Sequence, residues 1–457
     1  MSVKTILKQN RLETNKIMDI KDYFNQLDFD ESWSFKGCTQ KDTKYITHGY
    51  HRYPAKFIPQ IASRLIKELT ELGDFVCDPF MGSGTTLVEA KISDRPSVGV
   101  DINPVACLIS KAKVTAIDPK VIHESFDKLL LNLPISQNNK LRLPFSINEE
   151  STTYVINYKF SGSAHERIDY WFKPETKKEL EIIYSEIKKI KNKDVQTFFL
   201  CGFSHILKNC SIWLAKSNKP TRDFRKIIPD PYKTFLRHIK FMVKKNKDFW
   251  NILQSNDTMD TKAKPVCGDT IEIPVEDNSV SLVVTSPPYV TSYEYADLHQ
   301  LSAIWFGYTD DLAEFRKGFI GSAHNDTEEI EIGSELGKEI VDELMFRDKS
   351  KSKEVKVYFS EMRQSFLEMK RYLKKGGKAC IVIGDTSFKG VPVLNAEVFV
   401  EQMQNIGFKI YRIIKRMIPS KILPQTRDPR SGQFTSSTNS KKVLAYPYEY
   451  IIIMERL

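Results

Sequence analysis

The sequence predicts an α/β fold: a seven-stranded Rossmann-like sheet whose last strand is antiparallel, with a mainly helical insertion. The first observation is that short apolar runs alternate with amphipathic helical patterns, which is typical of βα units. The second is a Gly-rich turn between the first run and the helix after it. The third is that the last two runs follow each other closely, so the final strand can insert antiparallel. The expected strands span residues 75–78, 97–101, 265–268, 280–285, 378–384, 408–417 and 448–454.

Composition narrows the class of protein. The chain has 457 residues, of which 41% are apolar, and no apolar run reaches the 18 residues of a membrane span. Its start lacks the apolar segment of a secretory signal, so we expect a cytoplasmic protein. The seven cysteines are scattered without a CxxC pair, which predicts reduced thiols and no metal site. A net charge of +10 favours a polyanionic partner, nucleic acid first.

The first expected strand, Phe75–Asp78, runs into the turn Pro79–Thr86 and then into a helix. Gly82 and Gly84 allow the backbone to approach a ligand closely, and the helix N-terminus favours an anionic group such as a carboxylate. The turn lacks the lysine of a phosphate-binding P-loop and the GxGxxG spacing of a dinucleotide site. A tight turn without a ligand is the alternative.

Two further strands end in acids. Asp101 follows the glycines by roughly 20 residues, where a carboxylate can accept hydrogen bonds from both ribose hydroxyls. Ile102, next to it, can pack on an adenine face, and Asp269 follows the strand 265–268 in the same way. Upstream, an aromatic loop at 48–59 precedes a helix with apolar residues at i, i+3, i+4 spacing. These positions predict a nucleoside site at one edge of the sheet.

The stretch Thr285–Tyr289 ends its strand with two consecutive prolines, which cannot donate to a sheet or continue inside a helix. The rigid turn presents the hydroxyl of Ser286, free carbonyls and the aromatic face of Tyr289. This set suits a planar molecule with an exocyclic amine, because the oxygens accept from NH2 and the ring stacks on the plane. A proline-terminated strand followed by an ordinary loop is the alternative.

The middle of the chain interrupts the α/β pattern. Residues 117–262 predict helices at 177–191, 195–210 and 232–250. Residues 307–355 are polar and charge-rich, so we expect a mobile excursion there. The helix that follows them is expected to end at Gly376 and Gly377.

Basic residues concentrate in the insertion. Between residues 206 and 250 there are 12 lysines and arginines and only three acids, which favours phosphate contacts over a merely solvated helical face. The loop 419–442 is also basic. The candidate nucleic-acid-binding residues are Lys219, Arg222, Arg225, Lys226, Arg427 and Arg430.

These motifs resemble those of S-adenosylmethionine-dependent DNA amino-methyltransferases, in particular the N4-cytosine type of restriction-modification systems. Asp78–Thr86 is similar to the family's cofactor loop, and Ser286–Tyr289 is similar to its catalytic SPPY motif. The resemblance implies S-adenosylmethionine as cofactor, catalysis by the SPPY residues and no metal. The implied catalytic residues are Ser286, Pro287, Pro288 and Tyr289, and the implied cofactor-binding residues are Asp78, Pro79, Phe80, Gly82, Ser83, Gly84, Thr85, Asp101, Ile102, Asp269 and Phe57.

The implied activity is methyl transfer to the exocyclic N4 of cytosine in double-stranded DNA after base flipping. In the family, Ser before Pro-Pro-Tyr goes mainly with cytosine N4, and Asp or Asn goes mainly with adenine N6. N6-adenine DNA methylation, an RNA exocyclic-amine target and a non-catalytic DNA-binding module are the alternatives. C5-cytosine chemistry is rejected, because Cys267 precedes Gly-Asp on a strand and lacks the Pro-Cys context of a nucleophile. A separate cognate restriction endonuclease is a further implied partner.

The cofactor motifs precede the catalytic motif, which reverses the commonest SPPY arrangement. The resemblance therefore divides the chain into an N-terminal arm at 1–45, a cofactor-binding half at 46–116, a helical insertion at 117–262 and a catalytic half at 263–457. Because the insertion lies at the junction and carries no fold motif, we expect it to recognise the target sequence. Residues 307–355 and 419–442 are the competing segments.

Overall fold

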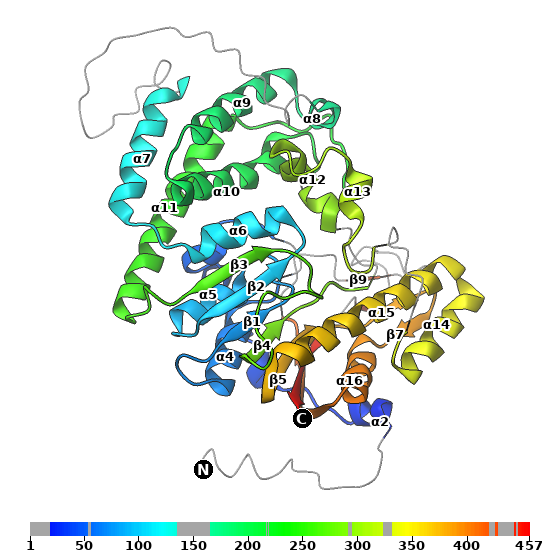
Figure 1. Cartoon of the computed structure of the whole chain (residues 1–457). Coiled ribbons are helices and arrows are strands. Elements are labelled where there is room, and N and C mark those ends of the chain that lie inside the picture. Colours follow the sequence, from blue (N-terminus) through cyan, green and yellow to red (C-terminus); the bar gives the residue numbers. More distant parts are fainter. Residues whose placement is uncertain are drawn as a thin grey trace.

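The computed structural model describes residues 19–53, 56–134, 165–215, 217, 219–290, 295–322, 331–419, 426–427, 443–444 and 447–457. Its centre is a seven-stranded sheet in the order β3-β2-β1-β4-β5-β11-β8 (Figure 1). The strands are β1 (Val76–Asp78), β2 (Ser97–Asp101), β3 (Ala263–Cys267), β4 (Val280–Thr285), β5 (Leu373–Ile383), β8 (Phe408–Met417) and β11 (Tyr448–Arg456). The first five are parallel, and β11 pairs antiparallel with both β5 and β8. The predicted fold class is confirmed, including the antiparallel last strand.

The order of the strands reverses at the pair β1 and β4. From β1 the chain continues outward to β2 and β3, and it then returns to place β4 on the other side of β1, with Val76 opposite Leu282 and Cys77 opposite Val283. In an open parallel sheet, ligands bind outside the carboxyl ends of the strands at such a reversal. The topology therefore locates a binding site above Asp78 and Thr285.

Helices cover both faces of the sheet (Figure 1). On one face, α4 (Pro59–Leu69) and α5 (Thr85–Ile92) share a buried core with Leu282 and Val284 of β4. On the other face, α15 (Lys349–Tyr372) and α16 (Asn395–Asn405) pack with Val283. Side chains alternate between faces along a strand, so burial on both faces explains why β4 is almost continuously apolar.

A separate helical group lies above the sheet in Figure 1. It contains α7 (Pro119–Asn132), α8 (Glu166–Trp171), α9 (Pro174–Lys188), α10 (Lys193–Cys210) and α11 (Pro231–Ser255). The helices predicted within 117–262 are confirmed as α9, α10 and α11. Their buried core also includes residues of α6 (Pro104–Val114), α12 (Tyr295–Trp305) and α13 (Leu312–Arg316). The group therefore packs with elements from both flanking parts of the chain.

Two expectations about the second half of the chain are wrong. The described residues 331–355 are mostly helical, with α14 (Glu335–Arg347) followed directly by α15, because Ile340, Val341 and Leu344 form a buried stripe among the charged residues. The helix does not end at Gly376 and Gly377, which lie inside β5. Gly376 has a φ of +74°, and the pairing of β5 with β4 shifts between Val280 and Leu282 at this irregularity.

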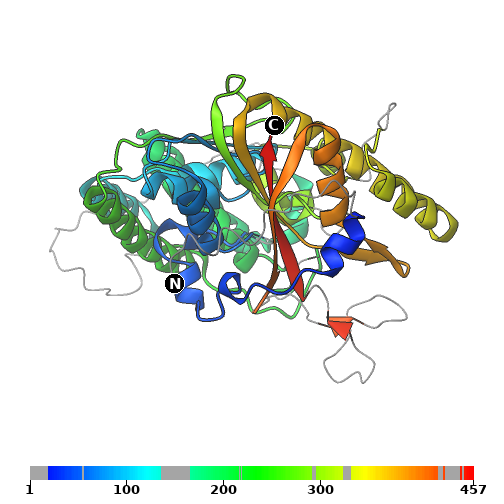
Figure 2. The same cartoon turned by 90° about the horizontal axis from the view of Figure 1, so that it is seen from below.

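The N-terminal segment runs along the edge of the sheet. It forms α2 (Ile20–Asn25) and η1 (Glu31–Trp33), and between them the N–H of Asp30 donates to the carbonyl of Lys415 on β8 at 2.9 Å. Arg416 Nε donates to the carbonyl of Trp33 at 2.7 Å, and Trp33 is fully buried. Figure 2 shows this blue segment passing the strands β8 and β11. An exposed edge strand invites pairing with other chains, and this segment covers it.

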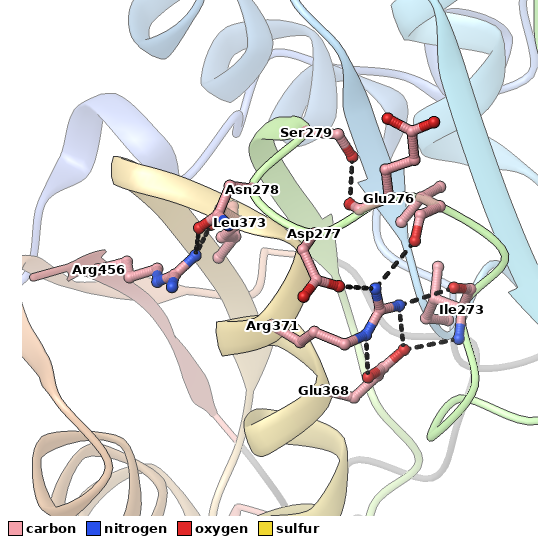
Figure 3. Close-up of polar contacts among 10 residues, drawn as sticks. Ile273, Glu276, Asp277, Asn278, Ser279, Glu368, Arg371, Leu373 and Arg456 are labelled. Carbon is pink, nitrogen blue, oxygen red and sulfur yellow. Dashed lines mark hydrogen bonds and ion pairs between the residues drawn. The ribbon is translucent and has the colours of Figure 1, made fainter.

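The turn that leads into β4 is fastened to the end of α15 by one arginine (Figure 3). Arg371 donates to the carbonyls of Ile273 and Val275 at 2.9 Å each and to Asp277 at 2.6 Å. Glu368 holds the guanidinium through two bonds of 2.8 and 2.7 Å and also accepts from the N–H of Ile273. The planar guanidinium thus sets the position at which β4 begins.

Replacing Arg371 with alanine is expected to lower the free energy of unfolding by about 2 kcal/mol, because two turn carbonyls and two carboxylates lose a partner that remains partly solvated. Urea denaturation measures the change. Arg347→Ala is the matched control, since that exposed arginine pairs with Glu343 on its own helix and is expected to change stability by less than about 0.5 kcal/mol. Equal losses in the two variants would contradict the clamp role of Arg371.

Candidate active site

A pocket lies at the carboxyl ends of the central strands, where the topology predicts it. The empty space in and above it is about 890 Å³, which includes space open to solvent. It is lined by Tyr53, Lys56, Phe57, Asp78, Pro79, Phe80, Met81, Gly82, Ser83, Thr85, Asp101, Ile102, Asp269, Thr270, Ser286, Pro288, Gly318, Phe319 and Ile320. The pocket therefore brings together residues from the Gly-rich turn, both acidic strand ends and the proline turn.

The Gly-rich turn needs its glycines for steric reasons. Gly82 and Gly84 have φ values of +48° and +73°, in the left-handed region that glycine adopts without strain. A Cβ on Gly82 would lie 3.1 Å from the ring of Tyr53, and one on Gly84 would lie 2.9 Å from Ser110 Oγ. The turn therefore runs close to its neighbours and leads directly into α5, although Gly84 itself does not line the pocket.

Two acids form the floor of the pocket. Asp101 accepts hydrogen bonds from the N–H groups of Gly82 and Asn103, both at 2.9 Å. Asp78 accepts from Thr285 Oγ1 at 2.6 Å and from the N–H of Phe80 at 3.2 Å. Burial raises the pKa of Asp78 to about 7 and the pKa of Asp101 to about 6. All these donors are neutral, so the two carboxylates favour a ligand that carries positive charge.

The Gly-rich turn and the proline turn are joined directly. Thr285, at the end of β4, donates to Asp78, at the end of β1. In return, Thr86 Oγ1 at the start of α5 donates to the carbonyl of Val284 at 3.0 Å. These two bonds fix the Gly-rich turn relative to the proline turn, so a ligand bound to the first is held at a fixed position relative to the second.

The proline turn places only part of its residues in the pocket. Ser286 and Pro288 line it, whereas Pro287 is buried and Tyr289 lies beside it. The Tyr289 ring approaches Gly384 at the end of β5, with 3.5 Å between its ring atoms and the position of a Cβ there. Its hydroxyl donates to Glu449 at 3.4 Å. The predicted catalytic set is thus close together, with Tyr289 outside the pocket lining.

A buried tyrosine holds the proline turn from behind. Tyr358 on α15 is fully buried, and its hydroxyl donates to the carbonyl of Pro288 at 2.8 Å. One helical turn later, Glu361 accepts from the N–H of Gly321 at 2.8 Å. Helix α15 therefore fixes both the proline turn and the segment next to the pocket wall at 318–320.

Several lining residues were not named as cofactor-binding residues. Tyr53 and Lys56 belong to the stretch Tyr53–Phe57, which resembles the segment of DNA amino-methyltransferases near the methionine moiety, but only Phe57 of that stretch was named. Met81 and Thr270 are neighbours of named residues. Burial lowers the pKa of Lys56 to about 8, and its ammonium donates to the carbonyl of His48 at 3.0 Å. The sequence does not predict that segment 318–320 lines the pocket, because it lies in a polar stretch without a motif. Its close approach to the cofactor-binding residues depends on Gly318, where a Cβ would lie 2.9 Å from Ile102.

The basic loop, which connects α10 to α11, contains four of the candidate nucleic-acid-binding residues, and the structure gives them different surroundings. Lys219 and Arg225 are exposed, and the Arg222 guanidinium lies 3.9 Å from the Tyr170 ring centroid and 4.4 Å from that of Phe224. Lys226 instead donates to the carbonyls of Lys208, Ser211 and Trp213 at 2.9, 2.7 and 2.8 Å. All three N–H groups of this ammonium are bonded to carbonyls at the end of α10, so none is available for a phosphate. Arg427 lies in the short strand β9 (Thr426–Arg427), but its side chain and Arg430 lie outside the described residues.

None of the helices in the described part of the chain has the length and hydropathy that a membrane span requires.

Comparison with known proteins adds a family match. The family model N6_N4_Mtase, described as a DNA methylase, matches residues 3–112 and 280–456, which is more than half of the chain. The unmatched interval includes all of α7–α11.

Type II methyltransferase M.MvaI of Kocuria varians is 27% identical over 436 residues, covering 90% of this chain and 93% of that protein. Type II methyltransferase M.MjaII of Methanocaldococcus jannaschii is 24% identical over 492 residues, with coverage of 91% and 84%. M.BsoBI of Geobacillus stearothermophilus, also a type II methyltransferase, is 22% identical over 414 residues, with coverage of 82% and 81%.

Proposed function

The chain belongs to the DNA methylase family of restriction-modification amino-methyltransferases, and from that premise we propose that it methylates the exocyclic N4 of cytosine in duplex DNA. The observation that carries the proposal is that Ser286 lines the same pocket as Asp78 and Asp101. An acceptor for an amine and the acids of a nucleoside site therefore share one pocket.

S-adenosylmethionine is the cofactor, and the residues of the pocket fit it. When bound, it supplies a methyl group activated by a positively charged sulfonium. Asp101 has the position and chemistry to accept from the ribose hydroxyls. Ile102 and Phe80 offer apolar surface for the adenine, with Asp269 nearby as an acceptor for its amino group. The buried acids Asp78 and Asp101 favour the cationic end of such a ligand.

The proline turn is proposed to activate the target amine. Its nitrogen is a poor nucleophile, because the lone pair is delocalised into the ring. Acceptance of its two N–H bonds by Ser286 Oγ and the Pro287 carbonyl draws the nitrogen toward tetrahedral geometry and frees that pair. Because Pro287 does not line the cofactor pocket, its carbonyl is proposed to face a target-base site beside it. The chain thus contributes positioning in a pocket sheltered from water, and a strong base is not needed.

In a duplex the target base is stacked and paired, so we propose that it is flipped into this site. The proposed stacking role of Tyr289 requires a target-base site beside the cofactor pocket, because its ring does not line that pocket. Stacking of a base on an aromatic ring contributes roughly 1–3 kcal/mol.

The identity of the target base rests on Ser286, since serine at this position goes mainly with cytosine N4. The test incubates the full chain with tritiated S-adenosylmethionine and, separately, duplex DNA, single-stranded DNA or RNA, followed by nucleoside analysis. Label in N4-methylcytosine from duplex DNA is the expected result. Label in N6-methyladenine, or label only in RNA, would replace the proposed target while keeping the chemistry. No label in any nucleoside would favour a non-catalytic DNA-binding module.

We propose that the basic loop of the helical group contacts the DNA backbone through Lys219, Arg222 and Arg225. Replacing all three with alanine is expected to reduce the slope of log affinity against log salt by about 2.7, at about 0.9 per lost phosphate contact. Fluorescence anisotropy of a labelled duplex at several salt concentrations measures it. Lys374→Ala with Lys375→Ala is the control, because β5 begins there at the end of the sheet opposite the pocket. An unchanged slope in the triple variant would remove the loop from the interface.

The hydrogen bond from Tyr358 to Pro288 is expected to position the proline turn. Tyr358→Phe should lower kcat by about 5-fold with little change in the Kd of the cofactor, since one hydrogen bond contributes about 1 kcal/mol to positioning. Tyr372→Phe is a matched control, because Tyr372 lies on the same helix, is equally buried and lies near Cys77 on β1. Equal turnover in the two variants would show that Tyr358 does not act through the turn.

A further inference from the structure

Two cysteines lie together beside the cofactor pocket. Cys107 is on α6 and Cys267 is the last residue of β3, where strand pairing places it opposite Asp101. The Cys107 thiol also donates to the carbonyl of Val266, the residue before Cys267, at 3.6 Å. Cys107 Sγ is 3.3 Å from the carbonyl oxygen of Asp101, and Cys267 Sγ is 3.8 Å from that of Ile102. The proposed methyl transfer uses neither thiol.

Their surroundings differ from those of the other cysteines in the chain. Cys267 is exposed and Cys107 is half-buried, so a small reagent can reach the pair. Cys77, Cys201, Cys210 and Cys380 are buried, and Cys38 lies in the N-terminal segment. The pair therefore combines access to solvent with a second thiol nearby, which is the arrangement of a reactive dithiol.

We propose that Cys107 and Cys267 form an oxidisable dithiol whose closure to a disulfide weakens cofactor binding. This inference concerns the pocket alone and is independent of the base that is methylated. A peroxide is the proposed oxidant, and a small thiol is the proposed reductant.

The chemistry has two steps. The Cys267 thiolate attacks one oxygen of hydrogen peroxide, which forms a sulfenic acid and releases hydroxide. The Cys107 thiol then attacks that sulfur, the S–S bond forms and water leaves. Overall, two thiols lose two electrons and two protons, and the peroxide is reduced to two molecules of water.

The order of these steps follows from the different pKa values of the two thiols. The neighbouring Cys107 thiol lowers the pKa of Cys267 to about 7, whereas the pKa of Cys107 is raised. The thiolate is the nucleophilic form of cysteine, so Cys267 reacts first at neutral pH and Cys107 resolves the sulfenic acid.

The consequence for the pocket follows from the backbone around the pair. A disulfide holds its sulfur atoms about 2.05 Å apart, closer than two thiols that are not bonded to each other, so the bond draws α6 and the end of β3 together. The carbonyls of Asp101 and Ile102 are in contact with the two sulfur atoms, and Asp269 is two residues beyond Cys267. The ribose and adenine sides of the site are therefore displaced together. By reciprocity, bound cofactor opposes oxidation by the same factor.

The test treats the full chain with hydrogen peroxide and maps its peptides without reduction. We expect a Cys107–Cys267 cross-linked peptide, a rise of at least about 10-fold in the Kd of S-adenosylmethionine by equilibrium dialysis, and recovery with dithiothreitol. Cys107→Ser and Cys267→Ser should abolish the cross-link and keep the Kd of the treated protein low, whereas Cys38→Ser should behave as the wild type. Prior addition of S-adenosylmethionine should slow cross-linking.

Two outcomes would overturn the proposal. One is the absence of the cross-linked peptide from the treated wild-type protein, a measurement that does not depend on any variant folding correctly. The other is complete cross-linking with an unchanged Kd. Loss of cofactor binding by the reduced, untreated protein would instead count against the proposed function, so the two failures are distinguishable.

Discussion

Ser286→Ala is expected to lower kcat for methyl transfer by about 100-fold, equivalent to about 2.7 kcal/mol, while the Kd of S-adenosylmethionine changes by less than about two-fold. Ser286 lines the pocket, and the proposed partner of its hydroxyl is the target amine. That hydrogen bond strengthens as the nitrogen becomes tetrahedral, so it contributes mainly in the transition state. Loss of such an interaction reduces kcat and kcat/KM together.

Single-turnover transfer of tritiated methyl to duplex DNA measures the rate, and equilibrium dialysis measures cofactor binding. Ser83→Ala provides the contrast, because Ser83 lines the same pocket on the Gly-rich turn. That variant should weaken cofactor binding and, at saturating cofactor, keep its rate within about three-fold of the wild type. Equal losses of rate and cofactor affinity in Ser286→Ala would show that its proposed role is wrong.

Asp101→Asn is expected to raise the Kd of S-adenosylmethionine by about 10- to 100-fold, in line with about 1.5–3 kcal/mol for hydrogen bonds to a charged group. The amide keeps the shape of the side chain and one of the two oxygens that accept from the Gly82 and Asn103 N–H groups. It loses the negative charge and the other acceptor oxygen, and the ribose hydroxyls are proposed to bind to the ionised carboxylate. Isothermal titration calorimetry with the cofactor measures the change.

The pH dependence of cofactor binding is a second measurement that tests the roles of Asp78 and Asp101. The pKa of Asp101 is raised to about 6 and that of Asp78 to about 7, so both gain protons as the pH falls below neutrality. The cationic cofactor binds better to the ionised acids. Its affinity should therefore be greatest near pH 8 and be lost progressively as the pH falls through 7 and 6.

In Asp101→Asn, the loss of affinity near pH 6 should disappear and the one near pH 7 should remain. Asp78→Asn should show the opposite pattern. Titrations of each variant at pH 5, 6, 7 and 8 distinguish the two acids. A profile identical to that of the wild type in both variants would assign the pH dependence to other groups.

The sheet and most of the pocket could be predicted because each signal is local. Two prolines after an apolar run must end a strand, and an acid at a strand end such as Asp101 is placed by the same backbone that forms the strand. The antiparallel last strand was predictable because the sequence of the loop-like segment from Met417 to Tyr448 shows no helical pattern of a crossover. In each case, a few consecutive residues contained the information.

The features that sequence reasoning missed depend on contacts between distant residues. The segment 318–320 reaches the pocket because Gly318 permits a close approach to Ile102, and nothing in its neighbours predicts that contact. Lys226 resembles a phosphate ligand in sequence, yet it caps α10 because three carbonyls converge on it. Gly376 is typical of a helix end, but the helix has already ended at Tyr372 and the glycine serves a strand irregularity.

The hydrogen bond between Thr285 and Asp78 joins residues 207 positions apart, and the strands on either side of it form the centre of the sheet. Contacts of such sequence separation raise the contact order, and high contact order slows folding, because the chain loses the entropy of a long loop before the pairing stabilises it. Much of the intervening chain forms helices with a hydrophobic core of their own. Early packing of those helices would shorten the effective loop between Asp78 and Thr285. The helices would thus affect the folding rate of the sheet, although they are not part of it.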